Sequence, residues 1–145
     1  MKKSYRPAWL WLLLLSVLWT GFIFVRSLQP AEVSSAESSL SLVLLQRIFP
    51  GASMFFVRKA AHFAEYLILG LLLGAGFRTV RRCSVFLPLI PAIGVAASDE
   101  LIQTMIPGRS GQVSDVLLDL SGTAAACVLA AIWVWLRKRK KRRQT

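Results

Sequence analysis

One stretch decides the fold of this chain: residues 54–77 read MFFVRKAAHFAEYLILGLLLGAGF. From Leu67 onward the stretch contains only apolar residues and glycine. Spanning the hydrocarbon of a bilayer as a helix takes about 20 mainly apolar residues, so the stretch is long enough. Its first half nevertheless carries four ionisable side chains, Arg58, Lys59, His62 and Glu65. It therefore predicts a membrane span that is polar in one half.

The composition of the whole chain agrees with a membrane protein. Of 145 residues, 55% are hydrophobic and 17% charged, and the formal net charge is +11. This combination excludes an ordinary cytosolic enzyme and a disordered chain. The basic residues are not interleaved with aromatic residues on a polar face, so we expect no nucleic-acid partner. The separated Cys83 and Cys127 imply neither a disulfide nor a cysteine metal site.

Three further stretches are long and apolar enough to be spans: residues 8–25, 85–106 and 113–136. The first has no charged residue, and the other two carry only Asp99 with Glu100 and Asp115 with Asp119. The spans and their connections account for nearly the whole chain. We therefore predict a single all-α membrane domain over residues 1–145, built as a four-transmembrane-helix bundle.

Positive charge in short connections is retained on the cytoplasmic side of a membrane. Lys and Arg are concentrated in the N-terminal tail, in residues 78–82 and in the C-terminal tail 137–145. Both termini are therefore predicted to be cytoplasmic. We also expect the C-terminal tail to contact anionic lipid of the inner leaflet.

The first connection, on the outer side, begins with polar residues 30–39 and continues with apolar residues 40–49. Ser34 and Glu37 have the spacing of a capping box, which predicts a short helix starting there. This helix is expected either to lie in the outer interface or to pack over the bundle. The first span is interpreted as a permanent anchor, and a cleaved signal peptide is the alternative.

The charged residues within the second, third and fourth spans all fall in the outer half. Arg58, His62 and Glu65 are four and three residues apart, and Asp99 and Glu100 precede Gln103 by four and three. Asp115 precedes Asp119 by four, so each span presents one polar helix face. A charge facing lipid costs ~3 kcal/mol or more, so these faces must meet one another, a water-filled cleft or a ligand. Ser98, Ser121 and the glycines are expected to let the helices approach closely there.

This predicted cluster contains more acid than base: five carboxylates accompany three cations and one histidine. The excess predicts a protonated carboxylate, a charged His62, or a bound cation or cationic ligand group. The expected ligand-binding residues are Arg58, Lys59, His62, Glu65, Asp99, Glu100, Gln103, Arg109, Asp115 and Asp119.

Four motifs make the chain similar to a known family. These are RKAAHFAEY at 58–66, DELIQ at 99–103, PGR at 107–109 and DVLLD at 115–119, followed by Gly122. Together they resemble the VanZ-like family of bacterial membrane proteins, whose members usually carry Asn where this chain has Asp119. The resemblance implies a cell-envelope protein of the bacterial cell membrane. The founding member is associated with low-level teicoplanin resistance, which does not by itself assign antibiotic resistance to this chain.

Three hypotheses follow for the polar cluster. In the first, it binds the polar headgroup of a lipid-linked envelope precursor, a phospholipid or a lipoglycopeptide, with Arg58, Lys59 and Arg109 holding phosphate or carboxylate groups. In the second, the protein is an intramembrane hydrolase or transferase in which His62 is a general base oriented by Glu65 or Asp99. Alternatively, His62, Glu65, Asp99 and Asp115 would hold a divalent cation. In the third, the cluster is a structural ion-pair network that fixes helix register.

Overall fold

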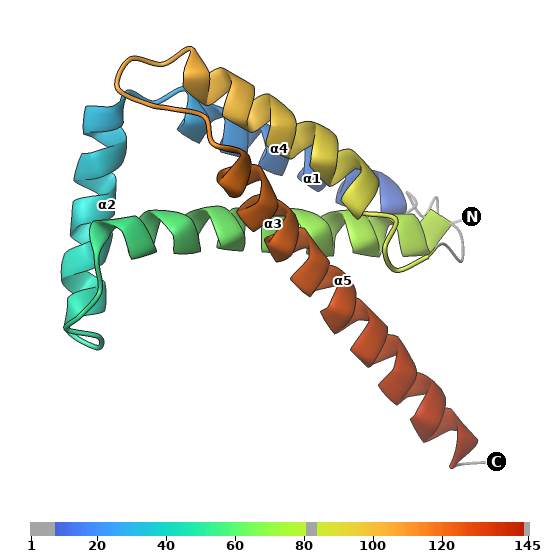
Figure 1. Cartoon of the computed structure of the whole chain (residues 1–145). Helices are drawn as coiled ribbons and strands as arrows, with labels where there is room; N and C mark the ends of the chain where they lie inside the picture. The colour runs from blue at the N-terminus through green and yellow to red at the C-terminus, as the bar shows by residue number, and fades with distance from the viewer. Residues whose placement is uncertain (1–7, 81–83, 144–145) are drawn as a thin grey trace, which may run out of the picture.

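The structure is a computed structural model that describes residues 8–80 and 84–143, and this part of the chain is all-helical (Figure 1). The five helices are α1 (Ala8–Ser27), α2 (Ala31–Gln46), α3 (Met54–Val80), α4 (Leu89–Thr104) and α5 (Val113–Arg142). Several residues on which the sequence analysis drew lie outside the described part: Lys2, Lys3, Arg6, Arg81, Arg82 and Cys83.

Helix α3 is the centre of the bundle. It packs most extensively against α5 and next against α1, while α4 lies beside α1 and against α5 (Figure 1). The buried core between these helices includes Ile23, Tyr66, Leu69 and Ala96. The packing of these side chains fixes which faces of α1, α3 and α4 meet.

Glycine allows α3 and α5 to cross at close range. A Cβ atom on Gly122 would fall on the backbone carbonyl oxygen of Phe63, and one on Gly70 would lie 2.8 Å from the Cβ of Ala126. The prediction that glycines permit close approach in the polar half is confirmed at Gly122, and Gly70 provides a second close approach in the apolar half. It is wrong for Ser98 and Ser121, which are exposed and donate hydrogen bonds to carbonyls of their own helices.

The prediction of four membrane spans is wrong in number. Three helices of the described part are long and apolar enough to cross a membrane: Ala8–Ser27, Met54–Arg78 and Val113–Lys140. The predicted span 85–106 contains only the 16-residue helix α4, which rises ~24 Å against a hydrocarbon thickness of ~30 Å. Pro88 and Pro91 confine the start of α4, because proline is tolerated only in the first turn of a helix.

Helix α4 still runs back along the bundle, so α1 begins and α5 ends at the same end (Figure 1). Helix α5 is longer than the predicted span and includes most of the basic tail, up to Arg142. The guanidinium of Arg137 lies 4.0 Å from the ring centroid of Trp133 in this part of α5. That the basic end faces the cytoplasm stays a prediction from charge.

Helix α2 occupies the predicted first connection and crosses the end of the bundle beside the start of α3 (Figure 1). The predicted capping box is wrong, because the N-cap is Pro30 and no side chain caps the helix. Ser34 instead lies inside the first turns of α2, and its backbone N–H donates to the Pro30 carbonyl. Placement of α2 in a membrane interface remains a prediction.

Candidate functional site

The polar side chains predicted from the sequence come together at one end of the bundle. Here α1 and α4 end and α3 and α5 begin, and we call this region the polar end (Figure 1). Four helices and the loop before α5 contribute to it. Several contacts there join elements that are distant in the sequence, so the polar end depends on the packing of several helices.

Helix α1 supplies two partners that the sequence analysis did not include. The Nε of Arg26 lies 3.1 Å from Oε1 of Glu65, and the hydroxyl of Ser27 donates a hydrogen bond to Asp99. The indole N–H of Trp19 also donates to the Glu65 carbonyl at 2.9 Å. These contacts make α1 part of the site, which favours the interpretation of α1 as a permanent anchor.

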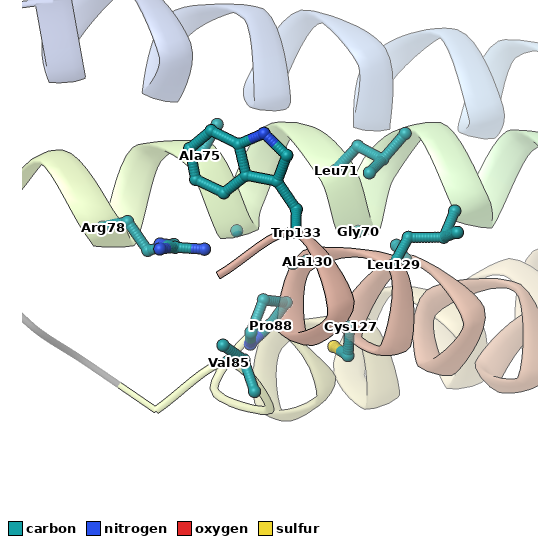
Figure 2. Close-up of a pocket in the computed structure, with 12 residues that line it drawn as sticks. Gly70, Leu71, Ala75, Arg78, Val85, Pro88, Cys127, Leu129, Ala130 and Trp133 are labelled. Atoms are coloured by element: carbon teal, nitrogen blue, oxygen red, sulfur yellow. The ribbon is translucent and has the colours of Figure 1, made fainter. Parts of the chain in front are cut away.

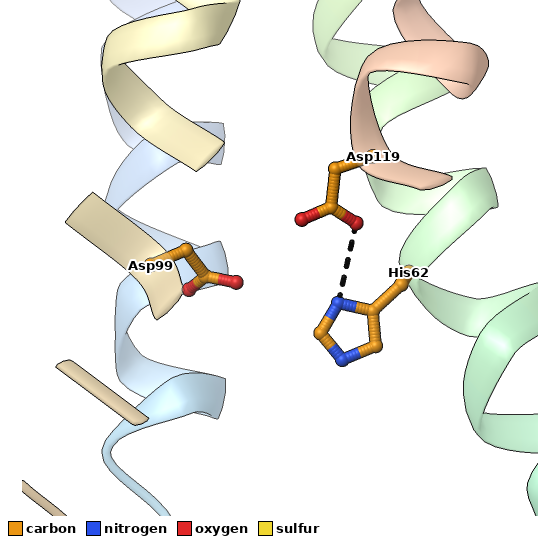
Figure 3. Close-up of side chains that lie close together, drawn as sticks. All are labelled: His62, Asp99 and Asp119. Carbon is orange, nitrogen blue, oxygen red and sulfur yellow. Dashed lines mark ion pairs between the residues drawn. The ribbon is translucent and has the colours of Figure 1, made fainter. Parts of the chain in front are cut away.

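His62 lies between α3 and α5, with its Nδ1 3.4 Å from Oδ1 of Asp119 (Figure 3). Asp99 reaches the same space from α4, and its Oδ2 accepts a hydrogen bond from the Gln103 side-chain amide at 3.2 Å. Asp99 and Asp119 are both completely buried. The sequence predicts Glu65 or Asp99 as the carboxylate that orients His62. In the structure, His62 pairs with Asp119 instead.

Two further carboxylates form contacts at the start of α5 and in the loop before it. Asp115 forms an ion pair with Lys59 of α3. Oε2 of Glu100 accepts a hydrogen bond from the Gln112 backbone N–H at 2.6 Å. A Cβ atom on Gly111 would lie 2.8 Å from the Glu100 carbonyl oxygen, so the loop passes α4 closely. These two carboxylates therefore attach α5 and its preceding loop to α3 and α4.

Arg109 caps the C-terminus of α1. Its Nη1 donates to the carbonyl oxygens of Arg26, Ser27 and Gln29 at 3.2, 3.3 and 3.3 Å. The last carbonyls of a helix lack partners within it, and a cation there also compensates the helix dipole. Burial lowers the pKa of Arg109, and the nearby positive charge of Arg58 lowers this pKa further.

A cleft of about 290 Å³ opens at the polar end. Its lining includes Arg58, Lys59, His62, Arg109 and Asp115, so cations predominate. Lys59 is paired with Asp115, and Arg109 caps α1. Among the described residues, by contrast, no hydrogen bond or ion pair involves Arg58. The cleft therefore presents a guanidinium that no described side chain pairs with.

A second hollow lies toward the other end of the bundle and is apolar. It has a volume of about 620 Å³ and is bounded by α3, α5 and the residues before α4 (Figure 2). Gly70, Pro88, Cys127 and Trp133 are among its lining residues, and Arg78 lies at its edge beside the Trp133 ring (Figure 2). We call it the apolar groove.

The fold and the site define an all-helical, multi-pass membrane protein with a polar cluster buried between its helices. The model of the VanZ/LLP1 family matches residues 11–134, and the chain belongs to this family. No curated protein sequence and no solved structure gives a match. The family match includes every residue of the polar end, which confirms the family that the sequence motifs resemble.

Tyr66 was also missed by the sequence analysis, although it stands next to Glu65. Its side chain is completely buried, and its hydroxyl has no hydrogen-bond partner. The backbone carbonyl of Tyr66 accepts a hydrogen bond from Thr123 at 3.2 Å. A signal for Tyr66 was present, because it lies four residues after His62 and so shares its helix face.

Proposed function

We propose that the cleft at the polar end binds the anionic headgroup of a membrane lipid or lipid-linked envelope molecule. The observation that carries the proposal is Arg58, a cation in the cleft that pairs with no carboxylate in the part of the chain that the structure describes. A guanidinium binds phosphate or carboxylate through two parallel hydrogen bonds. The binding of such a group would supply the anion that Arg58 lacks.

The distribution of charge within the polar end supports an anionic ligand. Of the five predicted carboxylates, only Asp115 lines the cleft, and it pairs there with Lys59. Asp99 and Asp119 are completely buried and do not line it. Arg58 and Arg109 are close enough that the charge of Arg58 lowers the pKa of Arg109. A ligand anion between two mutually repelling cations would be stabilised by both.

The rim of the cleft supports a ligand that comes from the membrane. Met54 and Phe55 line the cleft beside Arg58. Phe55 and Phe56 are exposed side chains at the start of α3. An apolar rim next to a cationic cleft suits a molecule whose headgroup enters the cleft while its hydrocarbon chain remains in lipid. The volume of about 290 Å³ suits a headgroup rather than a whole lipid.

The test uses the full chain in detergent, titrated with dioctanoyl phosphatidic acid and with dioctanoyl phosphatidylcholine. We expect saturable binding of the phosphatidic acid and a loss of about tenfold or more in affinity for Arg58→Gln, since a charge-assisted pair contributes ~1.5–3 kcal/mol. Arg47→Gln is the matched control, because Arg47 is exposed and lies outside the cleft.

The proposal fails if Arg58→Gln binds as tightly as the wild-type chain, or if both lipids bind equally. Mass spectrometry of lipids that copurify with the wild-type chain and are lost with Arg58→Gln would identify the natural headgroup. Teicoplanin susceptibility of cells carrying either variant provides the matching test in the cell envelope. A change with Arg58→Gln but not Arg47→Gln is expected if the bound molecule is an envelope precursor.

A second candidate function is an intramembrane hydrolase or transferase that acts on a lipid-linked substrate. His62 supports it, because this side chain lines the cleft and has the buried Asp119 carboxylate behind it. A histidine oriented by a carboxylate is suited to general base catalysis. Radiolabelled envelope lipids incubated with purified protein test this function. It requires a product that wild-type protein forms and His62→Asn does not.

A further inference from the structure

We propose that His62, Asp99 and Asp119 together bind a divalent transition-metal ion, with Zn²⁺ as the best fit. One side chain comes from each of α3, α4 and α5, and all three point into one space (Figure 3). The site differs from the set expected from the sequence, which had Glu65 and Asp115 in place of Asp119. It does not depend on the binding of a headgroup in the cleft.

The geometry of the donor atoms suits a metal ion. Each of the three residues offers a ligand atom, and these atoms lie within 4.8 Å of one another. His62 Nδ1 and Asp119 Oδ1 are 3.4 Å apart, longer than the ~2.9 Å of a good N–H···O hydrogen bond. Two ligands bonded at ~2.1 Å to one tetrahedral ion are ~3.4 Å apart. This pair therefore already has the separation of two metal ligands.

The second, independent observation is the Asp119 carboxylate itself. Its side chain is 0% exposed, and neither of its oxygens has a hydrogen-bond partner among the described residues. Nδ1 of His62 has none either. The ion pair of Asp119 with His62 is too long for a good hydrogen bond, so an ionised carboxylate in this position is poorly compensated without a metal. A divalent cation would compensate Asp119 and Asp99 at once.

Asp99 is held in place as metal ligands usually are. Ser27 donates to its Oδ1 and Gln103 donates to its Oδ2. Each carboxylate oxygen has two lone pairs, so each can accept a hydrogen bond and still bind an ion. Outer hydrogen bonds of this kind orient a ligand and raise affinity for the metal. Ser27 and Gln103 would thus be positioning residues for the site.

The nearby carboxylates outside the three are engaged elsewhere. Glu65 pairs with Arg26, Asp115 with Lys59, and Glu100 accepts from the Gln112 backbone. One imidazole nitrogen and two carboxylate oxygens suit Zn²⁺ better than Mg²⁺ or Ca²⁺, which prefer oxygen alone. Three protein ligands leave a fourth tetrahedral position free. Since His62 also lines the cleft, the ion would lie beside it.

The experiment measures metal binding by the full chain, purified in detergent, stripped with EDTA and titrated with ZnCl₂, MnCl₂ or MgCl₂. Elemental analysis after gel filtration should find equimolar zinc on the wild-type chain and none on His62→Asn or Asp119→Asn. Ser27→Ala should weaken zinc binding by roughly tenfold, the smaller effect expected of an outer partner. Glu32→Gln is the control and should bind zinc like the wild-type chain, because Glu32 is an exposed carboxylate in the first turn of α2.

Thermal unfolding gives a second readout, because zinc should change the stability of the wild-type chain relative to Asp119→Asn. In EDTA, Asp119→Asn should unfold at a higher temperature than the wild-type chain, since a buried and poorly compensated carboxylate is gone. With zinc, the wild-type chain should gain stability and Asp119→Asn should not, because only the form that binds is stabilised.

Either of two results overturns the proposal. One is a wild-type chain that binds no equimolar metal and whose unfolding temperature zinc leaves unchanged. The other is zinc binding or stabilisation of equal size in Asp119→Asn. Because Arg58→Gln keeps all three ligands, its loss of phosphatidic acid binding would leave zinc binding intact, so failures of the two proposals are distinguishable.

Discussion

The two ends of the bundle are held together in different ways. At the polar end, ion pairs and hydrogen bonds join α1, α3, α4 and α5, as in Arg26–Glu65 and Ser27–Asp99. Toward the other end, α3 and α5 present mainly apolar side chains to each other and leave the apolar groove of about 620 Å³ between them. Apolar contacts do not specify rotation or register as directed polar contacts do.

The difference indicates where the chain tolerates change. Polar groups inside a membrane are costly unless each has a partner, so their arrangement at the polar end is sensitive to the loss of any one group. The apolar groove contains few such groups and can change its lining without leaving a charge unpaired. We therefore expect substitutions to be costly at the polar end and at the crossing that supports it, and mild along the groove.

The largest effect is expected for Gly122→Val, at the crossing beside the polar end. The new side chain would meet the Phe63 carbonyl oxygen and would lie 3.1 Å or less from the Leu67 backbone nitrogen. Forcing α3 and α5 apart should cost roughly 3 kcal/mol. Thermal unfolding in detergent measures it. Gly94→Val is the control, because nothing lies within 4 Å of a Cβ there. Equal stability of both variants would mean that the helices are not in close contact.

The next largest effect is expected for Arg26→Met, which removes the cation beside Glu65. Arg26 is 32% exposed and Glu65 14%, so the loss should be ~2 kcal/mol, below that of a fully buried pair. Adding Glu65→Gln to the same chain should restore part of the stability, since it removes the unpaired carboxylate. Arg47→Met should change little. If the double variant is no more stable than the single one, the pair contributes through packing alone.

Lys59→Gln should have a smaller effect. The Lys59–Asp115 pair is partly exposed, so its loss should cost ~1 kcal/mol or less. Added salt screens partly exposed charges, and the difference from the wild-type chain should shrink as NaCl is raised. A cost that is independent of salt would indicate that the pair is shielded from solvent and belongs with the buried contacts of the polar end.

The smallest effect is expected in the apolar groove, for Gly74→Ala. The new methyl group would lie 3.6 Å from Cγ of Pro88, which is an ordinary van der Waals contact. Alanine also favours the helix by ~0.5–1 kcal/mol over glycine, so stability should stay level or rise slightly. Zinc and phosphatidic acid binding should be unchanged. A clear loss of stability would contradict the expectation that the apolar groove tolerates substitution better than the polar end.

Long apolar runs predicted α1, α3 and α5 well, because no proline interrupts these runs. The error in α4 has a local cause: Pro88 and Pro91 delay the start of a helix that composition alone extends to residue 85. The helix α2 was expected, but its start was placed at Ser34, although Pro30 is the residue that precedes the first turn.

The candidate site could be predicted as a group but not as a set of pairs. Spacing of three and four residues correctly placed His62 and Asp119 on faces that meet. Which carboxylate meets which cation depends on the rotation and depth of each helix, which spacing does not determine. Arg26 and Ser27 were missed because the first apolar stretch was ended at Val25, although an arginine in the last turn of a span is a recognisable signal.

The cap that Arg109 provides for α1 has a consequence for how the protein is made. Arg109 follows Arg26 by 83 residues, so α1 is synthesised well before the side chain that satisfies its last carbonyls. Until then, those carbonyls must be hydrated or otherwise occupied at the membrane surface. Assembly of the polar end is therefore a late event, completed when the loop before α5 reaches α1. A ribosome that stalled before residue 109 would leave the last carbonyls of α1 without this cap and the site unformed.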